Sequence, residues 1–232
     1  MAMADNKIFC VATVGEANWA TFHATVARLP GEWHLFSSPD NLDPLVLKRL
    51  NPRAIFFPHW RWKVPPEIVS AYECVAFHST DLPFGRGGSP IQNMIQLGKS
   101  VTKLTAFRMT DAFDAGPIYV QSDLSLVGPL HHILERAATL VGEMIATITK
   151  EWPTPTSQSG EATYFRRRAP SQSDIDTSDN CRELYDLIRM LDAPGYPHAF
   201  VESGKFRIEF RDVDQRADGT IEARVTIKEK DR

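Results

Sequence analysis

The sequence has few cysteines, no long apolar run and no basic leader. Its three cysteines, Cys10, Cys74 and Cys181, lie far apart, which argues against a disulfide framework and against a bound metal. No stretch approaches the roughly 20 consecutive apolar residues of a membrane span, and residues 1–7 lack a basic segment followed by an apolar signal core. We therefore expect a cytoplasmic protein with no membrane partner.

Basic charge is also not in excess. The chain carries 26 Lys and Arg against 29 Asp and Glu, a formal net charge of −3. Affinity for nucleic acids depends on neutralising many phosphates with Lys and Arg. The charge balance thus predicts that nucleic acid is not a partner, although it leaves local basic patches open.

The 232 residues, 43% hydrophobic and 24% charged, suit one globular domain with a small appendage. As far as about residue 126, short β-rich runs alternate with helix-like segments. This pattern predicts an α/β, Rossmann-like fold with a mainly parallel sheet and helices on both faces. The expected strands are Ile8–Val14, Trp33–Phe36, Ala54–Phe57, Cys74–His78, Lys103–Met109 and Ile118–Ser122.

Helices are predicted between several of these strands. The apolar spacing indicates helices over Trp19–Leu29 and Pro65–Tyr72. A third helix starts at Pro90, with Ser89 as its N-cap and Gly98 at its end. Its expected buried stripe is Ile91, Met94 and Ile95, and its expected polar face is Gln92, Asn93 and Gln96.

A longer helix is predicted from Pro129, and the Pro-, Ser- and Thr-rich stretch Trp152–Glu161 has the composition of a linker. Beyond it, the pattern predicts a helix over Arg182–Leu191 and strands near Ala199–Phe210 and Thr220–Ile227. We expect a catalytic domain over residues 1–152, a linker over 153–165 and a small α+β C-terminal subdomain over 166–232.

Two stretches of sequence carry the chemistry: VAFHSTDLPFGRGGSPIQNMI and KLTAFRMTDAFDAGPIYV. His78 ends a buried strand, and a later strand leads to Asp114-Ala115-Gly116. In open α/β sheets, ligands gather at the carboxyl ends of the strands. We therefore expect His78 and Asp114 to meet at one edge of the sheet.

These stretches resemble the folate-dependent formyltransferases, whose pattern is Asn-x-His, Ser-Leu-Leu-Pro, Arg-Gly, a proline-led helix and Asp-x-Gly. The matching positions here are His78, Ser79, Asp81-Leu82-Pro83, Arg86-Gly87, Pro90 and Asp114-Ala115-Gly116. The resemblance implies that 10-formyltetrahydrofolate carries the formyl group and that His78 and Asp114 are catalytic.

The sequence departs from this pattern at Ala76, where the family has asparagine. Formyl transfer passes through a tetrahedral species with a negative oxygen, and loss of one preorganised donor costs on the order of 10²–10³ in rate. Our hypothesis is that Asn93 supplies the missing hydrogen bond. Its position on the expected polar face, near the first helical turn, puts its carboxamide within reach of the same pocket.

Further site residues follow from the same resemblance. For the cofactor we expect contacts from Leu82, Pro83, Arg86 and Gly87, and from Trp60 in the loop His59-Trp60-Arg61-Trp62. For the acceptor we expect Ser79 and Arg86, with Tyr164 as an aromatic platform and Arg166 as a cationic donor.

Later segments resemble bacterial nucleotide-sugar N-formyltransferases, namely TYFRRRAP, IRMLDAPGYPHAFV and KFRIEF. HSTDLPFGRGGSP and FPHWRW are similar to enzymes that formylate a UDP-linked 4-amino-4,6-dideoxy sugar in pseudaminic acid biosynthesis. The resemblance implies a nucleotide-sugar acceptor, a role in surface polysaccharide biosynthesis and, as one option, a homodimer. The sugar stereochemistry and the nucleotide stay open.

Two alternatives stay open as well. An enzyme like methionyl-tRNA formyltransferase has the same chemistry and fold, although the acidic net charge and the short C-terminal part argue against it. The alanine at position 76 also permits a catalytically lapsed module that only binds folate or a sugar.

Overall fold

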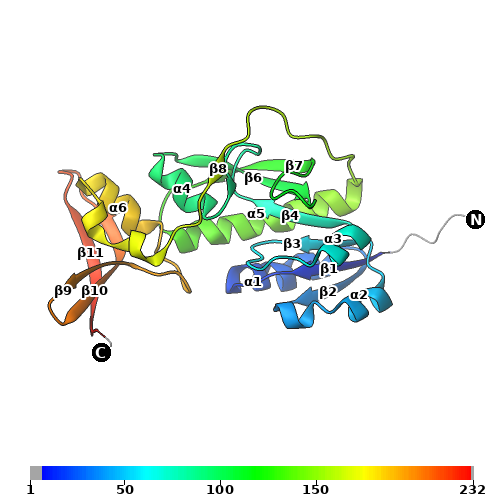
Figure 1. The fold of residues 1–232 in the computed structure, drawn as a ribbon, viewed down its shortest axis with the longest axis horizontal. Coiled ribbons are helices and arrows are strands. Elements are labelled where there is room, and N and C mark those ends of the chain that lie inside the picture. Colours follow the sequence, from blue (N-terminus) through cyan, green and yellow to red (C-terminus); the bar gives the residue numbers. More distant parts are fainter. Residues whose placement is uncertain (1–6, 231–232) are drawn as a thin grey trace, which may run out of the picture. The chain divides into compact units, whose positions relative to one another are not determined.

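The structure is a computed structural model that describes residues 7–230 (Figure 1). The described chain forms two compact units. Unit 1 comprises the described residues up to 86 together with 103–124 and 135–164, and unit 2 comprises residues 87–102, 125–134 and those from 165 onward. The expected domain boundaries at 152/153 and 165/166 stay a prediction. Within residues 7–230, no helix is long and apolar enough to cross a lipid bilayer.

A six-stranded sheet runs in the order β2-β1-β3-β4-β6-β7. Its strands are β1 (Ile8–Ala12), β2 (Glu32–Phe36), β3 (Ala54–Phe57), β4 (Cys74–His78), β6 (Val101–Arg108) and β7 (Ile118–Ser125). The pairs β1–β2, β1–β3 and β3–β4 are parallel, whereas β4–β6 is antiparallel. All four residues of β3 are buried, which is typical of an inner parallel strand covered on both faces. The expected α/β, Rossmann-like fold is confirmed.

Short helices connect the parallel strands (Figure 1). They are α1 (Glu16–Ala24), α2 (Pro44–Leu50) and α3 (Pro66–Ala71). The sequence reading missed α2, which Asp43 caps by accepting a hydrogen bond from the Leu45 amide. The helix expected over Trp19–Leu29 is interrupted, because the backbone leaves the helical region at Thr25 and continues as a 3-10 turn.

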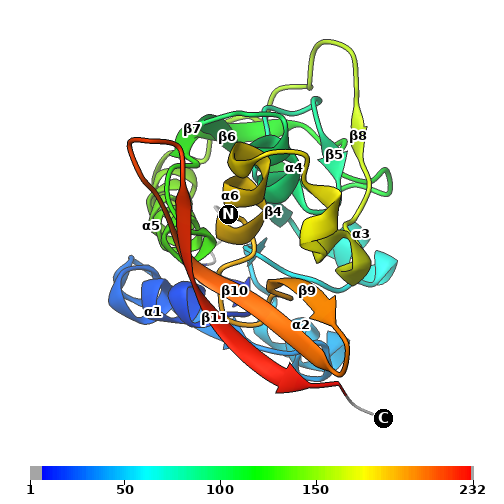
Figure 2. The ribbon, with the colours of Figure 1, turned by 90° about the vertical axis from the view of Figure 1, so that its left-hand side faces the viewer.

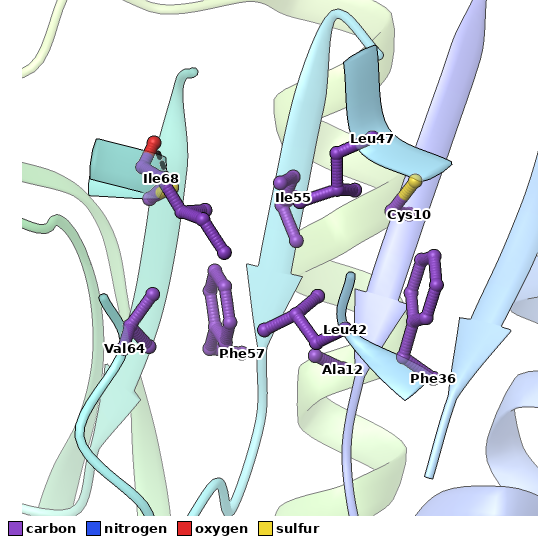
Figure 3. Close-up of a cluster of buried hydrophobic side chains, with 10 residues drawn as sticks. Cys10, Ala12, Phe36, Leu42, Leu47, Ile55, Phe57, Val64 and Ile68 are labelled. Carbon is purple, nitrogen blue, oxygen red and sulfur yellow. Dashed lines mark hydrogen bonds between the residues drawn. The ribbon is translucent and has the colours of Figure 1, made fainter. Parts of the chain in front are cut away.

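Apolar side chains of β1, β3 and β4 pack against α2 and α3 (Figure 3). The cluster comprises Cys10, Ala12, Phe36, Leu42, Leu47, Ile55, Phe57, Val64, Ile68 and Cys74. Burial raises the pKa values of the Cys10 and Cys74 thiols to about 12, so both behave as small hydrophobic groups. This core fixes the ends of β3 and β4 from which the site projects.

Helix α4 (Pro90–Gln96) belongs to unit 2 and differs from its prediction in two respects. Ser89 does not cap it: the residue has a left-handed backbone (φ 52), and its Oγ accepts a hydrogen bond from the Arg168 amide. Gln92 does not lie on an open polar face, because it is buried and its Nε2 donates to the Met190 carbonyl oxygen. Ile91, Met94 and Ile95 are buried as expected.

The remaining elements are the long helix α5 (Leu130–Glu151), helix α6 (Cys181–Arg189) and a three-stranded antiparallel sheet. That sheet has the order β11-β10-β9, from β9 (Ala199–Ser203), β10 (Phe206–Gln215) and β11 (Ile221–Glu229) (Figure 2). Asn180 caps α6 by accepting from the Glu183 amide. The predicted α+β character of the C-terminal part is confirmed. Finally, β5 (Arg86–Gly87) pairs with β8 (Tyr164–Phe165).

Candidate active site

His78 and Asp114 lie together in unit 1. His78 is the last residue of β4, and its ring is buried with only 8% of the side chain exposed. Nδ1 of His78 lies 3.7 Å from Oδ2 of Asp114, whose side chain is 13% exposed. The other ring nitrogen, Nε2, lies 2.8 Å from the carbonyl oxygen of Gly85. The structure therefore brings together the imidazole and the carboxylate that we predicted to converge.

These contacts fix the protonation pattern of the His78 ring. A backbone carbonyl can only accept a hydrogen bond, so Nε2 must carry the proton donated to Gly85. In the neutral ring, Nδ1 then has the free lone pair, and this is the atom that faces Asp114. A proton taken up at Nδ1 would produce an imidazolium flanked by a carbonyl and a carboxylate, both of which stabilise it.

Asp114 stands on a tight turn with a left-handed backbone (φ 50). The turn comes very close to β6: a Cβ added at Gly116 would lie 1.7 Å from the backbone oxygen of Arg108. No side chain larger than hydrogen fits there without moving the backbone. The Asp-Ala-Gly sequence is thus required for steric reasons at its third residue.

Gln158 holds this turn in place, and our sequence analysis missed it. Its Nε2 donates to the carbonyl oxygens of Asp114 (2.9 Å) and Gly116 (2.8 Å). Its Oε1 accepts from Arg86, 3.2 Å from Nε and 2.6 Å from Nη2. Gln158 comes from the stretch that we read as a linker, and a glutamine between serines gives no local signal of such a role.

Most of the other expected site residues of unit 1 lie close to His78 in the chain or are linked to the Asp114 turn through Gln158. Arg86 also donates from Nη1 to the hydroxyl of Tyr164, which is itself 68% exposed. Ser79 directly follows His78 in the chain and is half-buried. Leu82 and Pro83 are buried and line a cavity of about 450 Å³. Phe84, Gln121 and Gln158 contribute to the same cavity.

Trp60 follows β3 and packs against the core beneath the sheet edge. Its ring makes edge contacts with Phe57 and Trp62. The indole Nε1 is buried and has no hydrogen-bond partner among residues 7–230. Burial without a partner is unfavourable for an N–H group, and because this nitrogen is fully buried it can meet an outside acceptor only if the side chains around it move. Burial of the neighbouring His59, together with the nearby charge of Arg61, lowers the pKa of its imidazole to about 4.

Asn93, Gly87 and Arg166 belong to unit 2. The side-chain amide of Asn93 donates to the carbonyl oxygens of Gly88 (3.0 Å), Ser89 (2.9 Å) and Arg166 (3.5 Å). Gly87 has a φ of 108°, and a Cβ there would lie 2.3 Å from the Phe165 oxygen. Asn93 thus fastens the N-terminal end of α4 to the Arg166 segment, whatever else it does.

The residues of unit 1 fit a folate. A fused pterin ring needs apolar walls and a few hydrogen-bonding groups, which Leu82, Pro83 and polar side chains of the cavity such as Gln121 supply.

The C-terminal part matches a known family. Residues 170–228 match the model of the methionyl-tRNA formyltransferase C-terminal domain. Methionyl-tRNA formyltransferase from Clostridium thermocellum is 38% identical to this chain. The match covers 96% of this chain and 99% of that protein, with a TM-score of 0.90.

Two sugar N-formyltransferases are more distant. A 4-N formyltransferase from Francisella tularensis is 16% identical, with a TM-score of 0.63 and coverage of 95% of this chain and 97% of that one. PseJ from Anoxybacillus kamchatkensis, in complex with a UDP-linked formamido sugar and tetrahydrofolate, is also 16% identical, with a TM-score of 0.54 and coverage of 68% and 85%. These two likenesses show the fold alone.

The predicted nucleotide-sugar acceptor was therefore wrong, because similarity over nearly the whole chain favours the tRNA alternative. That prediction rested on the later segments TYFRRRAP, IRMLDAPGYPHAFV and KFRIEF, and its finer sugar assignment rested on HSTDLPFGRGGSP and FPHWRW, which include His78 and Trp60. The later segments lie within or next to residues 170–228, which match the methionyl-tRNA formyltransferase C-terminal domain. The two motifs with His78 and Trp60 lie next to the formyl-transfer chemistry, which is the same for every acceptor, and so they carry little information about the acceptor.

The expected folate carrier agrees with what formyltransferase homologues bind: PseJ and HypX from Aquifex aeolicus are both found in complex with tetrahydrofolate. A relative 38% identical over 99% of its length extends the likeness from the motifs around His78 to the whole chain. The chain belongs to the folate-dependent formyltransferase family.

Proposed function

We propose that this enzyme transfers a formyl group from 10-formyltetrahydrofolate to the amino group of methionyl-tRNA. The observation that carries the proposal is the 38% identity to a methionyl-tRNA formyltransferase over nearly the full length of both chains. The match of residues 170–228 to the C-terminal domain of such enzymes supports it independently of the catalytic motif.

The chemistry required of the chain is removal of a proton from the attacking amine. When bound, the folate would supply the formyl group, and its departing nitrogen would take up the proton that His78 removes from the amine. His78 accepts the amine proton at Nδ1, the ring atom that lacks a proton when Nε2 donates to Gly85. Asp114, 3.7 Å away, stabilises the resulting imidazolium and keeps the ring oriented.

The binding roles expected from the sequence are part of the proposal. Leu82, Pro83 and Trp60 hold the folate, with Arg86 and Gly87 shaping the loop beside it. Ser79, Tyr164 and Arg166 contact the acceptor. The cavity lined by Leu82 and Pro83 supports the first assignment for those two residues. The exposure of Tyr164 supports the second.

A net charge of −3 is compatible with an RNA acceptor, because affinity depends on local charge and not on the sum over the chain. Arg166 and Arg167 are exposed, and neither side chain forms a hydrogen bond or ion pair within residues 7–230. Two adjacent unneutralised guanidinium groups are suited to contact phosphates.

The test is an acceptor panel. The protein is incubated with 10-formyltetrahydrofolate and, separately, methionyl-tRNA, uncharged tRNA and UDP-linked 4-amino sugars, and folate release and product mass are followed. Of these acceptors, we expect only methionyl-tRNA to be formylated. The rate at limiting tRNA should fall steeply as the salt concentration rises, because contacts with phosphates release counterions. Formylation of a sugar with none of methionyl-tRNA would overturn the proposal, and the His78→Ala variant provides the background rate.

A further inference from the structure

Unit 2 contains a second pocket, of about 240 Å³, that formyl transfer as derived above does not use. Its walls come from residues 98–100, residues 126–128, helix α6 and Gln215 at the end of β10. All of these segments belong to unit 2, so the pocket is a property of that unit alone.

The pocket has two unneutralised cations. Lys99 and Arg182 line it, both are exposed, and neither side chain has a hydrogen-bond or ion-pair partner within residues 7–230. Asp186 is the one acidic residue of the lining, and its carboxylate accepts from Arg189 Nε at 2.6 Å. The negative charge is thus already neutralised, whereas the charges of Lys99 and Arg182 are not.

Arg189 holds the walls of the pocket together. Its side chain is 10% exposed, and Nη1 donates to the carbonyl oxygens of Leu126 (2.7 Å) and Gly128 (3.1 Å). Because Nε is at the same time paired with Asp186, one guanidinium ties α6 to the 126–128 segment. The two walls of the pocket are therefore held together before any ligand arrives.

Aromatic and apolar surface accompanies the charge. Tyr185 lines the pocket and is half-buried, and its ring lies 5.6 Å from the Arg189 guanidinium. Three large apolar residues in or next to the lining segments are exposed to an unusual degree: Leu97 (54%), Val101 (51%) and Val127 (63%). Exposed apolar side chains grouped around a polar pocket are typical of binding surfaces.

We propose that this pocket binds a nucleotide, with its phosphate between Lys99 and Arg182 and its base against Tyr185. Lysine and arginine are the usual phosphate ligands, and an aromatic ring stacks on any base. The volume is slightly below the roughly 300–1,000 Å³ of most ligand sites, so it suits one nucleotide and not a dinucleotide. The nucleotide is either free or a part of an RNA chain; the two sources share the same phosphate and base.

Binding is measured by calorimetry with three probes, AMP, inorganic phosphate and uncharged tRNA, in the absence of formyl donor. The test variant is Lys99→Ala/Arg182→Ala. The matched control is Lys48→Ala/Arg49→Ala, which removes the same two charges from the last turn of α2 in unit 1. All four side chains lie on the surface or near it, and thermal unfolding verifies that both variants fold.

We expect the test variant to lose roughly tenfold or more in affinity and the control to lose less than twofold. The slope of log affinity against log salt should fall by about one for each cation removed. Tyr185→Ala should weaken AMP binding and leave inorganic phosphate binding unchanged, since phosphate has no base to stack.

The probes also identify the source of the nucleotide. Loss of AMP affinity with unchanged tRNA affinity assigns the pocket to a free nucleotide, and a loss confined to tRNA assigns it to RNA. The proposal is overturned if neither probe distinguishes the test variant from the control. Since no formyl donor is present, this result is independent of whether the protein formylates methionyl-tRNA.

Discussion

Gln158 Nε2 lies 2.9 Å from the carbonyl oxygen of Asp114, and through this contact a residue 44 positions later in the chain holds the catalytic turn. The same nitrogen reaches the carbonyl of Gly116, and the amide oxygen accepts from Arg86. Gln158 touches neither His78 nor the Asp114 carboxylate in these contacts. It is a positioning residue, acting on the backbone that carries Asp114.

Gln158→Ala should lower kcat roughly tenfold with little change in KM, because small displacements of a catalytic group cost rate more than binding. Gln158→Glu should lose a similar amount: a carboxylate can still pair with Arg86 but cannot donate to the two carbonyls. Steady-state kinetics with each substrate varied in turn measures kcat and KM separately. Thr154→Ala, at an exposed position outside the cavity lining, is the control. Full activity in Gln158→Glu would contradict the positioning role.

Removing either member of the catalytic pair should abolish most activity. His78→Ala deletes the base, and general acid-base catalysis contributes typically ~10²–10⁴ in rate. Asp114→Asn keeps the shape but removes the charge that faces Nδ1, so it should lose a large part of the same factor. Single-turnover rates separate this chemistry from product release. An Asp114→Asn enzyme with unchanged rate would show that the carboxylate does not act through His78.

Gln92 and Gln158 show what sequence patterns could not predict. Strands Ala54–Phe57 and Cys74–His78 were predicted at their observed bounds, because short apolar runs mark the inner strands of a sheet. Gln92 and Gln158 were misread, since their partners Met190 and Asp114 are 98 and 44 residues away. The apolar periodicity of a segment predicts which of its faces is buried. It does not predict which carbonyl group, distant in the sequence, will lie against a polar side chain of that segment.

The prediction of the acceptor failed for a similar reason. The motif around His78 indicated formyl transfer correctly, because it is a continuous pattern of about forty residues. The short motifs gave no reliable information about the acceptor, and only similarity over nearly the whole chain favours methionyl-tRNA. Net charge is a sum over the chain and does not report local groups of cations such as Arg166 and Arg167.

Gly116→Ala should be among the most damaging substitutions in unit 1. A methyl group 1.7 Å from the Arg108 oxygen forces the backbone apart, and such strain costs several kcal/mol or displaces the Asp114 turn. Gly142→Ala is the control: its Cβ would meet the side-chain methyl of Thr21 at 2.9 Å, which can move. Denaturant unfolding should show a loss of at least about 3 kcal/mol for Gly116→Ala only, or activity should vanish in a folded protein.

Asn93→Ala tests whether Asn93 replaces the donor absent at Ala76. A catalytic role predicts a fall in turnover on the order of 10², similar to that of His78→Ala. The hydrogen bonds to Gly88 and Ser89 alone predict a stability loss of about 1–2 kcal/mol with near-normal turnover. Turnover measured well below the unfolding temperature distinguishes the two results, and normal turnover there would eliminate the catalytic role.

His59 should make the protein less stable in mild acid. Burial, with Arg61 nearby, lowers its pKa in the folded state from 6.5 to about 4. Between pH 6.5 and about 4, His59 is protonated in the unfolded chain but mostly neutral in the folded chain, so acid favours unfolding. The contribution is thus fully present above about pH 6.5 and is lost as the pH falls towards 4, with a total of about 3 kcal/mol.

His59→Asn should remove this part of the pH dependence, because asparagine does not titrate and tolerates the left-handed backbone (φ 51) found here. The measurement is the free energy of unfolding in urea at intervals from pH 4 to 8 for both proteins. His23→Asn, on the outer surface of α1, controls for loss of a histidine at an exposed site. Parallel curves for wild type and His59→Asn would mean that His59 charges freely in the folded protein, and that the loop carrying Trp60 opens to water.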